Sequence, residues 1–181
     1  MIIFNPLTRL SPQDFLNFTQ LNPELICELN PNGSITLKRD DYKPAIKKWR
    51  THLYNALVIW CRENENGFVA DKNTSFVLKT GAVRQPAMAW SRTFKKENTI
   101  ENFVEATPDF VVEFLSEHDT MESLKRKMRE YMTNGSSLAW LMDVDGEKIY
   151  IFRASGVDAE MSLYEKLSGE KVLRGFVFTD R

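Results

Sequence analysis

The residue that most suggests chemistry is a single carboxylate inside an apolar segment. Glu113 is the only charged residue between Phe110 and Leu115, in the run Phe-Val-Val-Glu-Phe-Leu. A buried carboxylate without a partner is energetically costly, so Glu113 requires a cation, a metal ion or solvent at the end of its strand. A structural salt bridge, for example to a lysine or arginine of the following helix, and a functional site are both open at this point.

Two lysines follow this segment in a predicted helix. At about 100° per residue, Lys125 and Lys127 both lie at the edges of the apolar stripe of that helix, whereas Arg126 points almost directly away from it. A lysine at the edge of a stripe can bury its methylene groups and bring its ammonium back over the sheet. Lysines in such positions are more often simply solvated, so the spacing alone leaves both interpretations open.

The composition narrows the classes of site that the chain can carry. The 181 residues include 24 basic and 25 acidic side chains, two cysteines and two histidines. This balance excludes a globally basic nucleic-acid binder, and the few cysteines and histidines exclude a disulfide framework and a Cys₄ zinc site. The basic residues concentrate in 38–50 and 125–129, each of which is either a solvated face or a local phosphate-binding patch.

These side chains must be positioned by a mixture of helices and strands. Capping signals and apolar periodicity predict helices over residues 11–21, 42–63 and 120–134, with Asp119 as the N-cap of the last helix and Glu122 as its capping-box partner. We expect residues 92–106 to form a loop with a short helix. The predicted strands are residues 24–29, 34–38, 68–70, 75–78, 82–90, 109–115, 138–143 and 148–153, with one or two more in the tail, such as 175–178.

This order of elements predicts a mixed α/β domain in which helices cover a central sheet. No linker-like segment divides the chain, so we expect one domain over residues 1–181, with a core at about 11–153 and a β-rich tail at 154–181. No run approaches the roughly 18 apolar residues of a membrane helix, and the N-terminal residues lack the features of a signal peptide. We therefore expect a cytoplasmic protein without a membrane partner.

The sequence also resembles a known family. The resemblance is carried by Thr-Pro-Asp-Phe-Val-Val-Glu at 107–113, Ser116, Asp119, Lys-Met-Arg-Glu-Tyr at 127–131, Asn-Gly at 134–135 and Leu-Ala-Trp-Leu-Met-Asp at 138–143. Segments 22–28 and 81–86 add weaker likeness. This pattern is similar to the Uma-type restriction endonucleases of the PD-(D/E)XK nuclease superfamily. The resemblance implies a restriction-endonuclease-like α/β (α+β) fold with a central mixed sheet flanked by helices.

The resemblance further implies a Mg²⁺-dependent DNA endonuclease. Phosphodiester hydrolysis requires charge neutralisation at the phosphoryl oxygens and an activated water, and Mg²⁺ held by carboxylates supplies both. By position, Glu113 corresponds to a metal ligand and Glu28 to an auxiliary acid. Lys127 corresponds to the catalytic lysine, moved onto the helix because Leu115 occupies its usual place. A homodimer is an expectation by analogy with nuclease-like folds.

The chain departs from the family pattern at two places. Where the family usually has Pro-Asp, this chain has Pro86-Ala87, and alanine cannot bind a metal ion. Asp109 cannot substitute, because two steps of the strand pleat place it about 13 Å from Glu113. The second departure is Lys-Arg-Asp-Asp-Tyr-Lys at 38–43, where the family often has small residues and glycine. We therefore expect impaired nuclease activity. The alternatives are a catalytically inactive binding or assembly protein and a domain in which Glu113 is purely structural.

Overall fold

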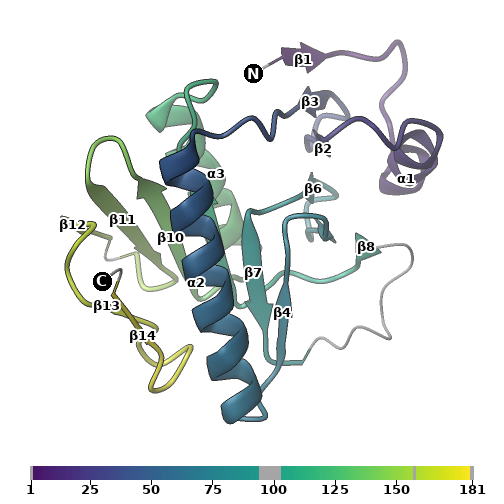
Figure 1. Ribbon diagram of the computed structural model, residues 1–181. Helices are drawn as coiled ribbons and strands as arrows, with labels where there is room; N and C mark the ends of the chain where they lie inside the picture. Colours follow the sequence, from purple (N-terminus) through teal and green to yellow (C-terminus); the bar gives the residue numbers. More distant parts are fainter. Residues whose placement is uncertain (1, 94–102, 157, 180–181) are drawn as a thin grey trace.

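The computed structural model describes residues 2–93, 103–156 and 158–179. Within these ranges the chain forms three helices, two six-stranded mixed sheets and a small two-stranded sheet (Figure 1). The helices are α1 (Pro12–Leu21), α2 (Pro44–Glu63) and α3 (Met121–Asn134). This architecture confirms the predicted mixed fold with helices on a sheet.

The first sheet has the strand order β1-β3-β2-β6-β5-β8. Its strands are β1 (Ile2–Phe4), β2 (Cys27–Leu29), β3 (Ile35–Leu37), β5 (Ser75–Val77), β6 (Val83–Arg84) and β8 (Phe103–Val104). The second sheet has the order β12-β11-β10-β9-β7-β4. Its strands are β4 (Phe68–Ala70), β7 (Met88–Ser91), β9 (Phe110–Phe114), β10 (Leu138–Asp143), β11 (Lys148–Arg153) and β12 (Ala159–Ser162), while β13 (Leu167–Ser168) pairs with β14 (Val177–Phe178).

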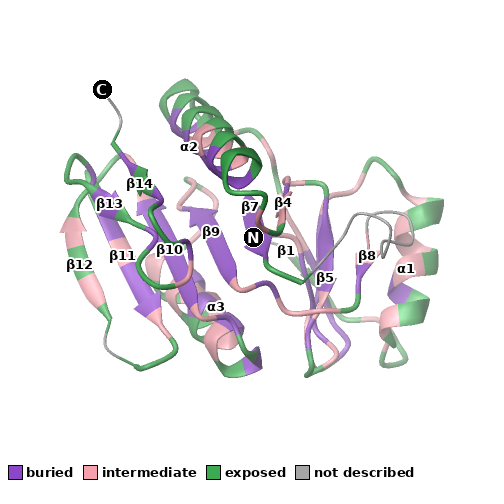
Figure 2. Cartoon of the chain, turned by 90° about the horizontal axis from the view of Figure 1, so that it is seen from below, coloured by how far each residue is buried: buried purple, intermediate pink, exposed green. Residues whose placement is uncertain are grey.

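The second sheet is covered on both faces, by α2 on one side and α3 on the other (Figure 2). Side chains alternate along β9, so Phe110, Val112 and Phe114 pack under α2. Val111 packs against the α3 side. Burial on both faces explains why the central strands read as continuous apolar runs. Glu113 shares the face of Val111 and is therefore directed toward α3.

Helix α3 connects the parallel strands β9 and β10, which pair from Phe110↔Leu138 to Phe114↔Met142. The predicted N-cap was wrong: the side chain of Thr120, not that of Asp119, accepts the hydrogen bond from the Ser123 amide. Glu122 does not form the predicted capping box. Asp119 does not cap the helix because it lies one residue before the N-cap. It accepts a hydrogen bond from the Ser116 hydroxyl at 2.6 Å.

The chain crosses from the first sheet to the second at residues 85–87. The sequence predicts one strand over 82–90, but β6 pairs with β2, and β7 pairs with β9 in the register Met88↔Val112. The strand is divided at Pro86, which has no amide hydrogen for a ladder. This crossing brings the end of the first sheet next to the centre of the second, and the candidate site lies there.

The remaining strand predictions are confirmed, although most of the strands in the first sheet are shorter than predicted. The tail forms β12, β13 and β14, which is more than the one or two strands expected. The predicted loop and short helix at 92–106 lie mainly outside the described residues, but Phe103 and Val104 form β8 beside β5. Within the described ranges, no helix combines the length and apolar character that a bilayer-crossing segment requires.

The packing of α3 on the sheet yields a stability prediction. Met128 is fully buried between α3 and the second sheet. We expect Met128→Ala to lower the free energy of unfolding by about 2–5 kcal/mol, through lost burial and the cavity it leaves. Arg129→Ala, one residue along on the exposed face, should change it by less than about 0.5 kcal/mol. Urea unfolding measures both, and equal effects of the two variants would contradict this placement of α3.

Candidate active site

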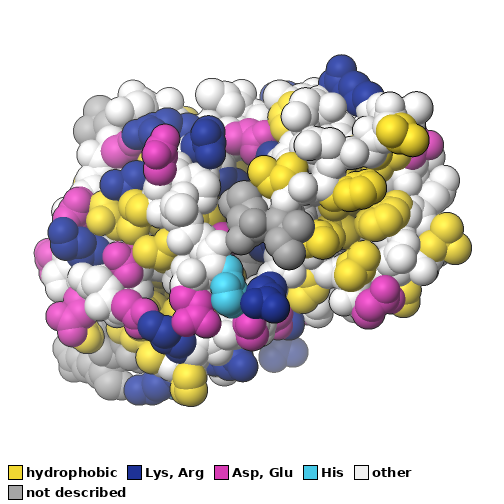
Figure 3. Space-filling model, turned by 90° about the horizontal axis from the view of Figure 1, so that it is seen from above, with side chains coloured by type: hydrophobic (Ala, Val, Ile, Leu, Met, Phe, Trp, Pro, Cys, Tyr) yellow, Lys and Arg dark blue, Asp and Glu magenta, His cyan; other side chains and the backbone are white. Residues whose placement is uncertain are grey.

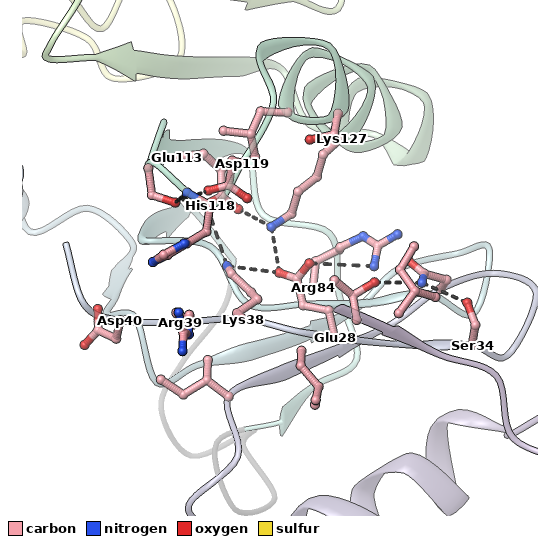
Figure 4. Close-up of a pocket in the computed structure, with 18 of the residues that line it drawn as sticks. Glu28, Ser34, Lys38, Arg39, Asp40, Arg84, Glu113, His118, Asp119 and Lys127 are labelled. Carbon is pink, nitrogen blue, oxygen red and sulfur yellow. Dashed lines mark hydrogen bonds and ion pairs between the residues drawn. The ribbon is translucent and has the colours of Figure 1, made fainter. Parts of the chain in front are cut away.

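The three predicted site residues come together from three different elements. Glu28 lies on β2, Glu113 on β9 and Lys127 on α3, and their side chains point toward one another (Figure 4). The Lys127 ammonium donates a hydrogen bond to Glu28 Oε1 at 2.6 Å and lies 2.5 Å from Glu113 Oε1. The contact with Glu113 is an ion pair without hydrogen-bond alignment, since this oxygen has no hydrogen-bond partner among the described residues.

A second lysine, Lys38, enters the same site, and the sequence did not predict it. Its Nζ donates to the Gln85 carbonyl at 2.8 Å and to Glu28 Oε1 at 3.3 Å, and it lies 3.9 Å from Glu113 Oε2. The hairpin register contains a signal that could have found it. Thr36 pairs with Glu28 across β2 and β3, so Lys38, two residues further, lies diagonally from Glu28 on the same face.

Arg84 and Glu130 complete the arrangement, and the sequence predicted neither. Arg84 forms a two-pronged ion pair with Glu130, at 2.6 and 3.1 Å, and donates to the Leu29 carbonyl. Its Nη1 lies 3.8 Å from Glu28 Oε2. We call the six side chains the buried ion cluster: Glu28, Lys38, Arg84, Glu113, Lys127 and Glu130. Three acids and three bases leave this cluster without net charge when all are ionised.

Burial and charge act in opposite directions on the cluster. Glu28 and Glu113 are only 4% and 2% exposed. Burial would raise the pKa of Glu28, but the nearby charges of Lys127, Lys38 and Arg84 hold that pKa well below its usual range. Burial would lower the pKa of Lys38, but the carboxylates of Glu113 and Glu28 raise it above its ordinary value. Glu28 and Lys38 therefore both remain charged at neutral pH.

Comparison with known proteins places the chain in a family. A family model described as "Putative restriction endonuclease" (Uma2) matches residues 12–180. The chain belongs to this family. A crystal structure of a putative nuclease belonging to DUF820, from Anabaena variabilis, has a TM-score of 0.78 and 12% identity to this chain, and the match covers 94% of each. At that identity the likeness establishes the restriction-endonuclease-like fold. No curated protein matches the chain.

Ala87 lies beside the buried ion cluster. It lies two residues after Gln85, and the Gln85 amide donates a hydrogen bond to Glu28 Oε1 at 2.9 Å. The β7–β9 ladder ends at Met88↔Val112, so the backbone of residue 87 lies one step beyond it, next to the part of β9 that holds Glu113. The methyl group of Ala87 is buried and packs in the apolar cluster under α2. The side chain at residue 87 therefore contributes no oxygen ligand.

The residues present do not fit a divalent metal ion. Mg²⁺ binding requires oxygen ligands that are free to coordinate, and carboxylates provide the charge. Here Glu28 and Glu113 are both engaged by ammonium groups, and no group of three or more acidic, histidine or cysteine side chains in the described ranges is arranged for a metal. Asp109 is engaged elsewhere, because it accepts hydrogen bonds from the Ser91 hydroxyl and the Arg92 amide.

The cluster lies at the floor of a cleft of about 1240 Å³. Side chains of both signs line it, including the basic Arg39 and Arg126 and the acidic Asp40, Asp41 and Asp119. The face of the molecule in Figure 3 also carries charges of both signs: acidic and basic side chains are interspersed, and hydrophobic side chains gather toward one end. The cleft therefore offers local cationic groups rather than a continuous basic surface.

The lowered pKa of Glu28 predicts a stability that depends on pH. A folded-state pKa below the unfolded value of about 4.3 stabilises the protein above that pH, and the contribution is lost as the pH falls. At pH 7 we expect Glu28→Gln to cost about 3–5 kcal/mol, because it leaves buried cations without a partner. Below pH 4 the difference from wild type should shrink by up to about 1.4 kcal/mol per pH unit.

Urea unfolding between pH 7 and pH 3 measures this difference. The exposed Glu63→Gln is the control and should change the free energy of unfolding by less than about 0.5 kcal/mol throughout. An effect of Glu28→Gln that is the same at pH 3 and pH 7 would contradict the charge-stabilised carboxylate.

Proposed function

We propose that the chain is a DNA endonuclease of the restriction-endonuclease type whose Mg²⁺-dependent phosphodiester hydrolysis is impaired. One observation carries the proposal: Glu28, Glu113 and Lys127 meet in one buried cluster beside residue 87, where this chain has alanine. The family membership supports nuclease ancestry. The impairment follows from the absence of an oxygen ligand at residue 87 and from the engagement of both carboxylates by lysines.

Each residue has a role in this proposal. Glu113 is the metal ligand of the ancestral centre, and Glu28 is the auxiliary acid that fixes the lysine. Lys127 is held by both carboxylates, so its charge is positioned before a substrate arrives and is suited to stabilise a phosphoryl oxygen. A divalent cation would supply charge neutralisation and an activated water in such a centre. In this chain the ligands for that cation are incomplete.

DNA is the proposed substrate class, with limited nonspecific affinity. Arg39 and Arg126 line the cleft and can contact phosphates, but Asp40, Asp41 and Asp119 line it as well. We also propose a single domain over residues 1–181, since the site needs β2 of the first sheet and β9 of the second. A homodimer belongs to the proposal by analogy with nuclease folds alone.

The second candidate is a catalytically inactive nuclease-fold protein with a binding or assembly role. The charge balance of the buried ion cluster favours it, because three acids against three bases leave no surplus of negative charge to attract a divalent ion. The two candidates share the fold and differ in whether an aspartate at residue 87 restores hydrolysis.

Restoring an aspartate separates these candidates. We expect Ala87→Asp to cleave duplex DNA with Mg²⁺ or Mn²⁺ at least about a hundredfold faster than wild type, since even outer-shell partners of a metal affect activity 10–100-fold. Ala87→Asn, which has nearly the same size without the charge, is the control and should remain at the wild-type rate. Conversion of supercoiled plasmid to nicked and linear forms is the measurement.

Two outcomes would overturn this account. Robust cleavage by wild type that equals Ala87→Asp and is lost in Glu113→Ala would contradict the impairment. An absence of cleavage by every variant, with folding verified by circular dichroism, would contradict the endonuclease proposal and favour the inactive candidate.

The role of Lys127 is tested in the Ala87→Asp background. We expect Lys127→Met to lower the cleavage rate by about 10²–10³-fold, the usual cost of removing one preorganised group that stabilises developing charge. Lys125→Met is the matched control on the same helix, because the Lys125 ammonium lies over the Tyr150 ring, 3.9 Å from its centre. Equal rates for the two lysine variants would exclude Lys127 from the chemistry.

A further inference from the structure

The Lys38 ammonium has an unusual set of neighbours for a lysine. The Gln85 carbonyl, one carboxylate oxygen of Glu28 and one of Glu113 surround it at 2.8, 3.3 and 3.9 Å. Gln85 belongs to the segment that joins the two sheets. Glu28 on β2 and Glu113 on β9 both face Lys38 in Figure 4. Carboxylate and backbone carbonyl oxygens are the ligands that hard cations prefer in proteins. The fold thus converges oxygen donors on one cation, and that cation is a side chain of the chain itself.

We infer that Lys38 is the resident cation of the buried ion cluster: its ammonium occupies the place between Glu28, Glu113 and the Gln85 carbonyl and competes with a divalent metal ion for it. The correspondence with a nuclease centre rests on the proposed function. The occupancy of the place by Lys38 does not depend on whether the chain cleaves DNA.

Lys127 is a different kind of neighbour. It contacts Oε1 of both carboxylates, whereas Lys38 faces the other oxygen of Glu113 and also binds a backbone carbonyl. The Lys38 side chain is 21% exposed against 11% for Lys127, and both line the cleft. Removal of the Lys38 ammonium would therefore leave an oxygen-lined space that an ion can reach from solvent.

The charges of the cluster support the inference. The six side chains are neutral together when ionised, so a divalent ion added to them would carry uncompensated charge into a buried site. Replacing Lys38 by a neutral residue and Ala87 by aspartate changes the total from zero to −2. That is the charge that one divalent cation balances. A single replacement changes the total by only −1.

Lys38 also accounts for a stable fold without hydrolysis. A buried carboxylate pair needs a positive partner, and an ammonium meets that need as well as a metal ion does. An ammonium carries one charge and has no open coordination position, so it cannot hold and activate a water molecule as a metal does. An ammonium in place of a metal ion therefore keeps the cluster neutral and removes the metal-dependent chemistry.

Metal binding by four proteins tests the inference: wild type, Ala87→Asp, Lys38→Met and the double variant. Isothermal titration calorimetry with MnCl₂ is the measurement. We expect no detectable binding by wild type and at least about tenfold tighter Mn²⁺ binding by the double variant than by Ala87→Asp. The unfolding temperature of the double variant should also rise with Mn²⁺. Binding by the double variant that is no tighter than by Ala87→Asp would overturn the inference.

Matched controls keep the test interpretable. Lys43→Met combined with Ala87→Asp removes a lysine that pairs with the exposed Asp145, and it should bind Mn²⁺ as Ala87→Asp does. Lys38→Gln replaces Lys38→Met if the methionine variant does not fold, and the same tenfold criterion applies. Equal gains from removing Lys43 and Lys38 would also overturn the inference, since they would reflect net charge alone.

Cleavage assays on the same proteins separate this inference from the proposed function. Tight Mn²⁺ binding by the double variant without DNA cleavage would uphold the role of Lys38 and contradict the endonuclease proposal. Cleavage by Ala87→Asp with no gain in Mn²⁺ affinity on removal of Lys38 would uphold the endonuclease proposal and contradict the role of Lys38.

Discussion

The structure depends on the neutralisation of two buried carboxylates by two lysines at the junction of the sheets. Glu28 and Glu113 come from different sheets, and neither could be buried there without a cation. Lys127 reaches them from α3, and Lys38 from the end of β3. Because each partner belongs to a different element, the cluster joins the sheets and α3. The same ion pairs therefore form the candidate site and stabilise the fold.

Under the proposed function, this constraint explains how a nuclease fold without a metal ion remains folded. A bound metal ion offsets the free-energy cost of burying carboxylates. The loss of one acidic ligand together with the gain of a lysine offsets that cost equally well. In that proposal, alanine in place of aspartate at residue 87 and Lys38, 3.9 Å from Glu113 Oε2, each make the charge of the site more positive. A substitution at either position alone would leave the charge of the cluster unbalanced.

The sequence predicted the local part of this site and missed the long-range part. Strand alternation and helical periodicity singled out Glu113, Lys125 and Lys127 as candidates, because both patterns depend on neighbouring residues, and the family resemblance chose Lys127 over Lys125. Glu28 was found only through family resemblance. Lys38, Arg84 and Glu130 were missed, since their contacts arise where two sheets meet, and no local spacing encodes that meeting. The division of the predicted strand 82–90 at Pro86 was missed for a related reason: β6 and β7 have different partners.

The most direct test of this account is anomalous diffraction from crystals of the unaltered protein soaked in MnCl₂. The account predicts electron density for the Lys38 ammonium between Glu28, Glu113 and the Gln85 carbonyl, with no anomalous peak there. An anomalous peak bridging Glu28 and Glu113, with Lys38 displaced toward the cleft, would contradict it.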